Sequence, residues 1–351
     1  MRATASQEAH KEASMTDTVL VTGISGFLGG HVALQLLNAG YRVRGSVRNL
    51  SKADKVRDTL SKAGADTSRL EFVALDLLSD AGWAEAMAGI RFLQHTASPF
   101  VLETPKDPDD LIRPAVEGTR RAIAAALASQ VERVVLTSSI AAIQYGHADY
   151  SRAYDEADWT NLDSANTGAY PMSKTLAERE AWTLMDAAGR HDDLAVINPA
   201  GILGPLLDED PGTSSTLVRR LIDGKLPAVP KLAMSVIDVR DVAALHVDAM
   251  TNPAAGGQRC IASTGTYWMS DMGRMLKPSF PDRRIPTVEL PTWLIRVISL
   301  FDRDIRDNMQ EIGTMKPLDG ERGSQRLGRP LIPADAATIA TARSLIAHHL
   351  V

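Results

Sequence analysis

The stretch that decides the fold is Val21-Thr22-Gly23-Ile24-Ser25-Gly26-Phe27-Leu28-Gly29, with the pattern T-G-x-x-G-x-x-G. It follows an apolar run and opens a segment of helical periodicity, the context of a dinucleotide-binding turn. Gly23 permits a tight turn, Gly26 lets the backbone approach a pyrophosphate, and Gly29 lets the helix lie close to the strand. The start of the helix also favours bound phosphates through its N–H groups and partial positive charge. The cofactor-binding residues predicted here are Thr22, Gly23, Ser25, Gly26, Phe27, Leu28 and Gly29.

Outward from this turn, short apolar runs alternate with longer helical periods. The expected strands are 18–22, 41–47, 70–75, 91–97, 133–137 and 194–198, and the expected helices are 27–39, one from 51, 81–88, 110–129 and 167–189. Strict alternation with continuous apolar strands is typical of a parallel sheet that is covered on both faces. Right-handed crossovers then give a Rossmann-type, doubly wound α/β fold. We predict this fold with a smaller C-terminal substrate lobe.

The alternation ends after residue 198, and this change suggests the domain limits. Residues 1–16 are polar and rich in Ala and Ser, lack the apolar region of a signal peptide, and are expected to form a disordered leader. Residues 17–200 are expected to form the dinucleotide-binding domain, with 235–250 returning to it. Residues 201–234 and 251–351 are expected to form the smaller substrate-binding lobe.

Composition and charge exclude several classes of function. The 351 residues include 38 Lys and Arg and 43 Asp and Glu, for a net charge of −5, so nothing favours nucleic-acid phosphates or an anionic membrane. The apolar stretch 290–301 contains Arg296 and is too short to span a bilayer. Cys260 is the only cysteine, and the histidines lack H-x-x-x-H spacing, so no disulfide and no metal site is expected. We therefore expect a cytoplasmic protein without nucleic-acid or membrane partners.

The end of the second expected strand indicates which nicotinamide cofactor is bound. An NAD site normally has Asp or Glu about 20 residues after the glycine turn. This chain instead has Arg48, followed by Lys52 and Lys55. Because a guanidinium suits a phosphate and an acid would repel it, the sequence predicts NADPH/NADP+, with Arg48 and Lys55 among its ligands. Asp76 and Leu77, after the third strand, are predicted to contact the adenine edge.

Two further motifs supply acid–base groups. Tyr170 and Lys174 form a Y-x-x-x-K pair, which lies on one face of a helix. Tyrosine has a pKa of about 10, and a nearby ammonium lowers the pKa of a tyrosine, so that it can donate a proton to a carbonyl oxygen. Ser139 ends the fifth expected strand, at the sheet edge where ligands bind in such folds. Its hydroxyl can hydrogen-bond a substrate carbonyl, so Ser139, Tyr170 and Lys174 are the predicted catalytic set.

The order of T-G-x-x-G-x-x-G, the T-S-S of residues 137–139 and Y-x-x-x-K resembles the extended short-chain dehydrogenase/reductase family. Residues 40–48, 95–99, 198–199, 204–205 and 238–243 resemble a narrower branch, that of dihydroflavonol reductases, cinnamoyl-CoA reductases and NADPH-dependent aldehyde (methylglyoxal) reductases. The resemblance implies the same catalytic set, with Lys174 also holding the nicotinamide ribose. It adds Ala97, Ser98, Pro199, Ile202 and Leu203 as cofactor contacts.

The expected reaction is NADPH-dependent reduction of an aldehyde or ketone to the alcohol, with Tyr170 as the proton donor. Sugar dehydratases of this family carry an Asp-Glu pair after the serine, where this chain has Ile140-Ala141-Ala142. Arg48 disfavours an epimerase that holds NAD. A hydroxysteroid dehydrogenase, a nucleotide-sugar epimerase and a non-catalytic NADP-binding sensor stay open as alternatives.

Apolar and aromatic residues after the strand ends suggest the substrate. Phe100, Ile140, Tyr145 and Trp268 are the predicted substrate contacts. Such a lining favours a small hydrophobic carbonyl compound. We expect the protein to act on it as a monomer or a homodimer.

Overall fold

The computed structural model describes residues 17–98, 107–300, 306 and 309–351. These residues belong to two compact units, which are described here one at a time. Unit 1 comprises Met1–Ala142, Gly168–Asn198 and Ala243–Cys260. Unit 2 comprises Ile143–Thr167, Pro199–Val242 and Ile261–Val351. The expected leader and Phe100 lie outside the described residues, and the domain limits expected from the sequence stay a prediction.

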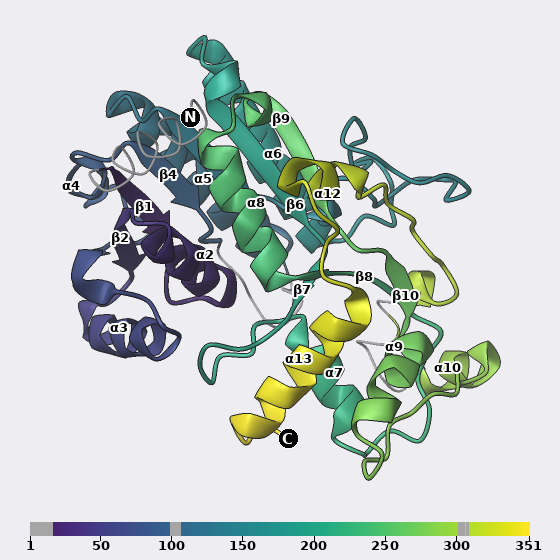
Figure 1. The fold of residues 1–351 in the computed structure, drawn as a ribbon. Coiled ribbons are helices and arrows are strands. Elements are labelled where there is room, and N and C mark those ends of the chain that lie inside the picture. The colour runs from purple at the N-terminus through teal and green to yellow at the C-terminus, as the bar shows by residue number, and fades with distance from the viewer. Residues whose placement is uncertain (1–16, 99–106, 301–305, 307–308) are drawn as a thin grey trace. The chain divides into compact units, whose positions relative to one another are not determined.

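Unit 1 is built on a seven-stranded sheet with the order β3-β2-β1-β4-β5-β6-β9 (Figure 1). The strands are β1 Thr18–Thr22, β2 Arg42–Val47, β3 Leu70–Ala74, β4 Phe92–His95, β5 Arg133–Thr137, β6 Leu194–Pro199 and β9 Gln258–Ala262. The pairs from β3 through β6 are parallel. The chain therefore runs outward in both directions from β1 and β4, and ligands of such sheets bind at this reversal of strand order. This confirms the predicted Rossmann-type α/β class.

Helices cover both faces of this sheet. They are α2 Phe27–Asn38, α3 Ala53–Lys62, α4 Trp83–Met87, α5 Asp109–Ala128, α6 Ala169–Ala187 and α8 Val239–Thr251. One face packs against α4, α5 and α6 through a core that includes Leu20, Leu93, Ile123 and Met185. Each of these side chains is almost fully buried, which gives the layer its hydrophobic stabilisation. Strands β1 to β6 begin and end within two residues of their predicted positions, as do helices α2, α4, α5 and α6, whereas β9 was not predicted.

The helix expected from residue 51 begins instead at Ala53. The side chain of Asn49 accepts a hydrogen bond from the backbone N–H of Ser51 at 2.9 Å. This contact caps a short 3-10 turn, Leu50–Lys52, that precedes the helix. The cap thus lies two residues earlier than Ser51, because an asparagine side chain competes well for free backbone donors.

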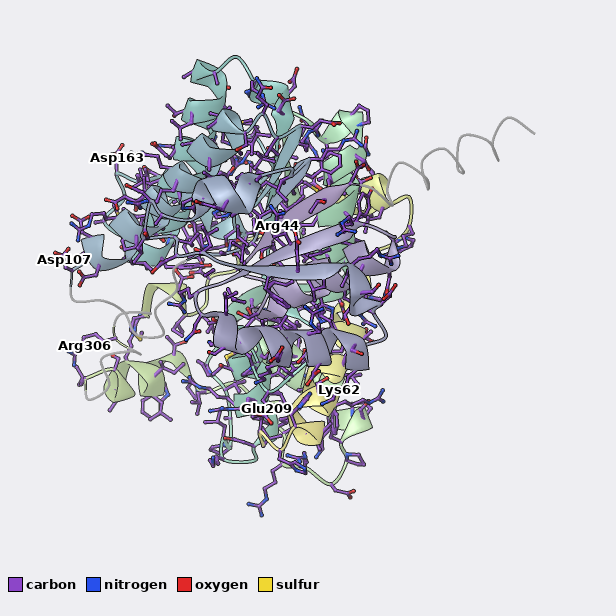
Figure 2. The ribbon with its side chains drawn as sticks, turned by 90° about the vertical axis from the view of Figure 1, so that its left-hand side faces the viewer. Arg44, Lys62, Asp107, Asp163, Glu209 and Arg306 are labelled. Carbon is purple, nitrogen blue, oxygen red and sulfur yellow. The ribbon has the colours of Figure 1, made fainter. Side chains whose placement is uncertain are left out.

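Arg44 of β2, labelled in Figure 2, connects the sheet to the end of α4. Its guanidinium donates to the backbone oxygens of Ala86 and Ala88, at 3.0 and 2.7 Å, where α4 ends. It also pairs with Glu71 of β3 at 2.7 Å. A cation at a helix C-terminus satisfies carbonyls that have no partner within the helix.

On the other face, α8 is joined to the sheet by a buried polar network. Nδ1 of His246 lies 2.8 Å from Oε1 of Gln94 on β4, and Nε2 lies 3.0 Å from Oγ1 of Thr137 on β5. Nε2 of Gln94 donates back to the backbone oxygen of His246 at 2.9 Å. Burial lowers the pKa of His246 to about 3. The imidazole is therefore neutral in the folded protein over the ordinary pH range.

Unit 2 carries a three-stranded sheet, β10-β8-β7. The strands are β7 Gly201–Leu203, β8 Ala233–Asp238 and β10 Thr266–Trp268, with β7 and β8 parallel and β10 antiparallel. The helices include α7 Ser215–Ile222, α9 Met269–Leu276, α10 Thr292–Ile298, α12 Glu321–Leu327 and α13 Ala334–Ala347. The smaller C-terminal lobe that the sequence predicts thus has a mixed sheet of its own.

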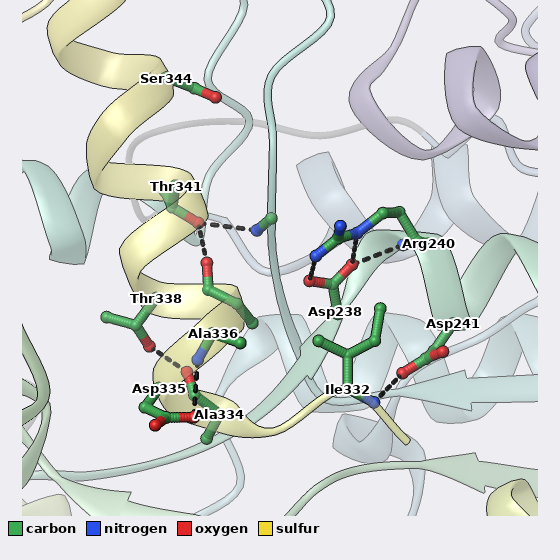
Figure 3. A network of polar contacts seen from close by, with 12 residues as sticks. Asp238, Arg240, Asp241, Ile332, Ala334, Asp335, Ala336, Thr338, Thr341 and Ser344 are labelled. Carbon is green, nitrogen blue, oxygen red and sulfur yellow. Dashed lines mark hydrogen bonds and ion pairs between the residues drawn. The ribbon is translucent and has the colours of Figure 1, made fainter. Parts of the chain in front are cut away.

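Polar contacts join α13 to the rest of unit 2 (Figure 3). Oγ1 of Thr341 accepts from the backbone N–H of Gly204 at 2.7 Å. Asp241 accepts from the N–H of Ile332 at 2.5 Å and pairs with Arg329 at 2.6 Å. Asp238 pairs with Arg240 at 2.7 Å. The buried carboxylates of Asp238 and Asp241 are thus each compensated by an arginine.

We predict that protonation of His246 destabilises the protein in acid. The folded form resists the proton while the unfolded histidine accepts it near pH 6.5, so stability falls as the pH decreases from about 6.5 toward 3. His246→Gln should make the slope of unfolding free energy against pH shallower by up to about 1.4 kcal/mol per pH unit between about pH 6 and 4. Urea denaturation at a series of pH values measures this slope. His349→Gln, at an exposed position, is the control, and equal slopes in all three proteins would contradict the prediction.

Candidate active site

The predicted glycine turn joins β1 to α2 in unit 1. Gly23 has a φ of +69°, and its carbonyl oxygen accepts from the N–H of Gly26 at 3.0 Å. A Cβ at Gly29 would overlap that same carbonyl oxygen, so only glycine lets α2 begin this close to the strand. A Cβ at Gly26 would meet nothing closer than 3.4 Å. Packing within the chain does not require glycine at position 26, whereas a pyrophosphate at the helix N-terminus does.

The end of β1 is tied to the end of β4, beside this turn. Oγ1 of Thr22 lies 2.8 Å from Nδ1 of His95 and accepts from the N–H of Ala97 at 3.2 Å. Oγ1 of Thr96 donates to the carbonyl of Thr22 at 2.6 Å. Burial, and then the charge of Lys174, lower the pKa of His95 to about 4. His95 is therefore a neutral structural group, and the two strand ends are held together where the strand order reverses.

The residues predicted for the adenosine side follow β2 and β3. Arg48 comes directly after β2, Lys55 lies in the first turn of α3, and both side chains are exposed. Oδ1 of Asp76 accepts from the N–H of Leu78 at 2.9 Å, which shapes the turn after β3. The side chain of Leu77 approaches Gly118 of α5. The structure thus places Arg48, Asp76 and Leu77 just after the carboxyl ends of two neighbouring strands, and Lys55 on the helix that follows the first of them.

The predicted catalytic residues come from two elements of unit 1. Ser139 follows β5, and its Oγ accepts from the N–H of Ala141 at 3.0 Å, so its own hydrogen can be donated elsewhere. Tyr170 lies in the first turn of α6 and is 39% exposed. Lys174 follows one turn later, with Nζ 5.8 Å from the centre of the Tyr170 ring and 2.9 Å from Oγ of Ser98. The tyrosine and the lysine therefore share one face of the helix, as the spacing predicts.

A small cavity lies beside Lys174 in unit 1. Its lining includes Leu77, His95, Ala97, Ser98, Lys174 and Glu178. Four of these residues were predicted to contact the cofactor, and they come from the ends of β3 and β4 and from α6. The donors present, a serine hydroxyl and an ammonium, fit the ribose hydroxyls of a nicotinamide nucleotide.

The remaining predicted contacts are distributed over both units. Ile140 is buried in unit 1, at the start of the 3-10 turn Ile140–Ala142. In unit 2, Nζ of Lys316 lies 3.9 Å from the ring centre of Tyr145, and Nζ of Lys231 lies 5.1 Å from that of Trp268. Pro199 ends β6, while Ile202 and Leu203 lie on β7 of unit 2. The cofactor and substrate roles of these residues stay predictions.

A buried ion pair in unit 1 was not predicted from the sequence. Glu178 of α6 and Arg259 of β9 are joined at 2.6 Å, with side chains 0% and 8% exposed. The available signal was the position of Glu178 four residues after Lys174, on the helix face that carries Tyr170 and Lys174, the two predicted catalytic residues. No pattern in the sequence around Arg259 indicated that its side chain would pair with Glu178.

The described residues contain neither a metal cluster nor a membrane-spanning helix. No group of three or more His, Cys, Asp or Glu side chains in the described ranges is placed to hold a metal ion. Within the same ranges, no helix is long and apolar enough to cross a bilayer.

Comparison with known proteins defines the class to which this fold and site belong. Residues 19–262 match the model of the NAD dependent epimerase/dehydratase family. The chain therefore belongs to that family, the extended short-chain dehydrogenase/reductases, and is an NAD(P)-dependent oxidoreductase, which confirms the resemblance seen in the motifs.

Particular relatives are similar over most of their length. An uncharacterized oxidoreductase of Schizosaccharomyces pombe is 36% identical over 282 residues, which are 76% of this chain and 83% of the relative. A cinnamoyl-CoA reductase of Medicago truncatula is 33% identical over 279 residues, 78% of this chain and 84% of the relative. The crystal structure of the yeast methylglyoxal/isovaleraldehyde reductase in complex with NADPH has a TM-score of 0.78 at 26% identity, covering 95% of this chain and 100% of that one.

The two glycines of the turn are predicted to respond differently to alanine. Gly29→Ala should lower the free energy of unfolding by about 1–3 kcal/mol, because the methyl overlaps the Gly23 carbonyl oxygen. Gly26→Ala should change stability by less than about 0.5 kcal/mol but weaken NAD(P)H binding about tenfold or more, because its methyl stands between backbone and pyrophosphate. Urea denaturation and nicotinamide fluorescence titration separate the two effects. Unaltered dinucleotide binding by Gly26→Ala would remove the turn from the cofactor site.

Proposed function

We propose that this protein reduces an aldehyde or ketone to the alcohol with NADPH. The observation that carries the proposal is the pairing of Tyr170 and Lys174 on one face of α6, with Lys174 held by Ser98 beside the cavity. Proton donation needs a positioned hydroxyl with a charge nearby to stabilise its anion, and this pair supplies both. The reductase names of the cinnamoyl-CoA and methylglyoxal/isovaleraldehyde relatives support the same chemistry.

The chain's own residues manage the proton in this reaction. NADPH supplies the hydride that is added to the carbonyl carbon. Ser139, whose Oγ already accepts from Ala141, would donate a hydrogen bond to the carbonyl oxygen and polarise the C=O bond while keeping its own proton. Tyr170 gives its phenolic proton to that oxygen as negative charge develops there, and the Lys174 ammonium offsets the charge left on Tyr170. The product is the neutral alcohol.

The choice of NADPH depends on charge at the end of β2. Arg48 and Lys55 are exposed cations at the position where the 2′-phosphate is expected, and Val47 and Arg48 end the strand without an acid. A guanidinium binds a phosphate through paired donors, whereas a carboxylate would repel it. NADPH in the similar yeast structure agrees with this choice.

The substrate is a small hydrophobic carbonyl compound in this proposal. Ile140, Tyr145, Trp268 and Phe100 are its proposed contacts. The turn after Ser139 consists of three buried apolar residues, Ile140–Ala142, so it offers no carboxylate for a dehydratase reaction. A hydroxysteroid dehydrogenase, an epimerase and a non-catalytic sensor are distinguished from this function by the assay below.

Turnover is measured as the loss of reduced-nicotinamide absorbance with NADPH and NADH in parallel. Aromatic aldehydes, α-dicarbonyls, β-keto esters and a keto-steroid represent the candidate substrates. Tyr170→Phe should lower kcat by about 100-fold or more, because an acid–base group of this kind contributes about 10² to 10⁴ in rate. Its NADPH affinity by fluorescence titration should remain near that of the parent protein.

The control for this variant is Tyr41→Phe, at a half-buried tyrosine just before β2. It should retain the parental kcat. Near-full turnover by Tyr170→Phe would remove Tyr170 from the mechanism. Tight NADPH binding by the parent without reduction of any carbonyl would contradict the reductase function and favour an epimerase or a sensor.

Cofactor preference is predicted to reverse when the charge after β2 is reversed. Arg48→Asp should lower the ratio of kcat/KM for NADPH to that for NADH by about tenfold or more, since an acid repels the 2′-phosphate and accepts from the 2′-hydroxyl. Initial rates with both cofactors measure this ratio. Lys62→Asp, which makes the same charge change at the far end of α3, should leave it unchanged. An unaltered ratio in Arg48→Asp would assign phosphate recognition to other bases.

A further inference from the structure

The carboxylate of Glu178 lies in the interior of unit 1. Glu178 is 1% exposed and lies one helical turn after Lys174 and two turns after Tyr170 on α6. It lines the cavity that also contains Lys174 and Ser138. A buried carboxylate is strongly destabilising unless it is paired and hydrogen-bonded. The ion-pair and hydrogen-bond partners of Glu178 therefore indicate which part of unit 1 this carboxylate stabilises.

The charge of Glu178 is balanced by a residue far away in the chain. Nε of Arg259 on β9 donates to Oε1 of Glu178 at 2.6 Å, across 81 positions of sequence. Replacing such a buried pair with apolar residues is often neutral or stabilising, so the pair is not explained by stability alone.

The second oxygen of Glu178 connects the helix to the catalytic serine. Oε2 accepts from Oγ of Ser138 at 2.5 Å and from Nδ2 of Asn198 at 2.8 Å. The same Nδ2 of Asn198 also donates to the backbone oxygen of Ser139, at 3.2 Å. Glu178 thus holds the residue before Ser139 directly and Ser139 itself through one asparagine.

We propose that the Glu178–Arg259 pair is a positioning device that holds Ser139 in register with Tyr170 and Lys174 and, by its charge balance, sets the pH range of proton transfer. Glu178 and Arg259 act through the three catalytic residues and do not contact the substrate. The inference rests on the proposed reductase function. It assigns a role to two residues that none of the recognised motifs contains.

The charges around the site make the effect of each partner predictable. Among described residues, the titratable side chains lining the cavity are His95, Lys174 and Glu178, and burial keeps His95 neutral. His246, which faces Thr137 from α8, is neutral for the same reason. The other residues that line the cavity carry no charge. Without Arg259 an uncompensated anion would remain near Lys174, and without Glu178 an uncompensated cation would remain.

These two charges should shift the pH–rate profile in opposite directions. Reduction requires a protonated Tyr170, so activity declines on the alkaline side. The uncompensated cation in Glu178→Gln favours the phenolate, which moves the alkaline decline to lower pH. The uncompensated anion in Arg259→Met disfavours the phenolate, which moves the alkaline decline of activity to higher pH. Two helical turns span about 12 Å, and at an effective dielectric constant of about 20 to 40 each shift is about half a pH unit to one unit.

The test is a set of pH profiles of kcat/KM for the carbonyl substrate with NADPH saturating. The double variant Glu178→Gln/Arg259→Met carries neither charge and should return the alkaline decline to the parental pH, while kcat stays reduced because Ser139 is no longer held. Glu178→Asp keeps the negative charge but has a shorter side chain, so it should lower kcat without changing the pH at which activity declines. Glu180→Gln, also on α6, breaks a partly exposed pair with Arg120 of α5, with 2.7 Å between the charged atoms, and should change neither kcat nor the pH of the alkaline decline.

Each outcome supports or overturns the inference. Opposite shifts in the two single variants with return in the double variant support it. The inference is overturned if the alkaline decline shifts in the same direction in both single variants, or if it does not shift in variants that fold. If a single variant fails to fold, the double variant and Glu178→Asp still decide, since a parental kcat in both would refute the positioning role.

If the parent protein reduces no carbonyl compound, the proposed reductase function fails, and this is a separate outcome from failure of the inference. The Tyr170 ionisation is then followed by phenolate absorbance, as the difference between each protein and the same protein with Tyr170→Phe.

Discussion

At the glycine turn, helix α2 begins so close to strand β1 that the carbonyl oxygen of Gly23 leaves no room for a side chain at Gly29. The rest of the site depends on this approach. It directs the N-terminus of α2 across the carboxyl end of the sheet and leaves room at Gly26, the residue before the helix, where an added Cβ would meet no atom closer than 3.4 Å. The approach brings the partial positive charge of the helix to the point where the strand order reverses.

The carboxyl ends of the central strands are held by buried polar networks. Thr22 binds His95 across β1 and β4, and His246 joins β4 and β5 to α8. Glu178 joins the end of β5 to α6. Each network satisfies polar groups that would be strongly destabilising if left unpaired in the interior. Together they connect the elements that carry Ser139, Tyr170 and Lys174, which is what a reaction with several positioned groups requires.

The motifs predicted from the sequence account for the local part of the site. Tyr170 and Lys174 share a helix face because their spacing matches the helical period, and Gly23 and Gly29 meet because the turn between them is short. The helix expected from residue 51 begins two residues later, at Ala53, because Asn49 caps a short 3-10 turn that precedes it. Asn49 and Ser51 both have good capping chemistry, and a sequence pattern alone does not decide between two caps so close together.

The sequence by itself determined the class of fold, through the alternation of apolar runs and helical periods along the chain. It also determined the glycine turn, the pairing of Tyr170 and Lys174 on one helix face and the cationic residues after the second strand, because each of these follows from residues close together in the chain. Only the tertiary structure decided that Glu178 pairs with Arg259 and that His246 binds Gln94, contacts separated by 81 and 152 positions. No local pattern encodes such pairs, because they depend on the order of strands in the sheet and on which helix covers each face. The physical reason is that a buried charge or imidazole is stable only where the fold brings it a partner.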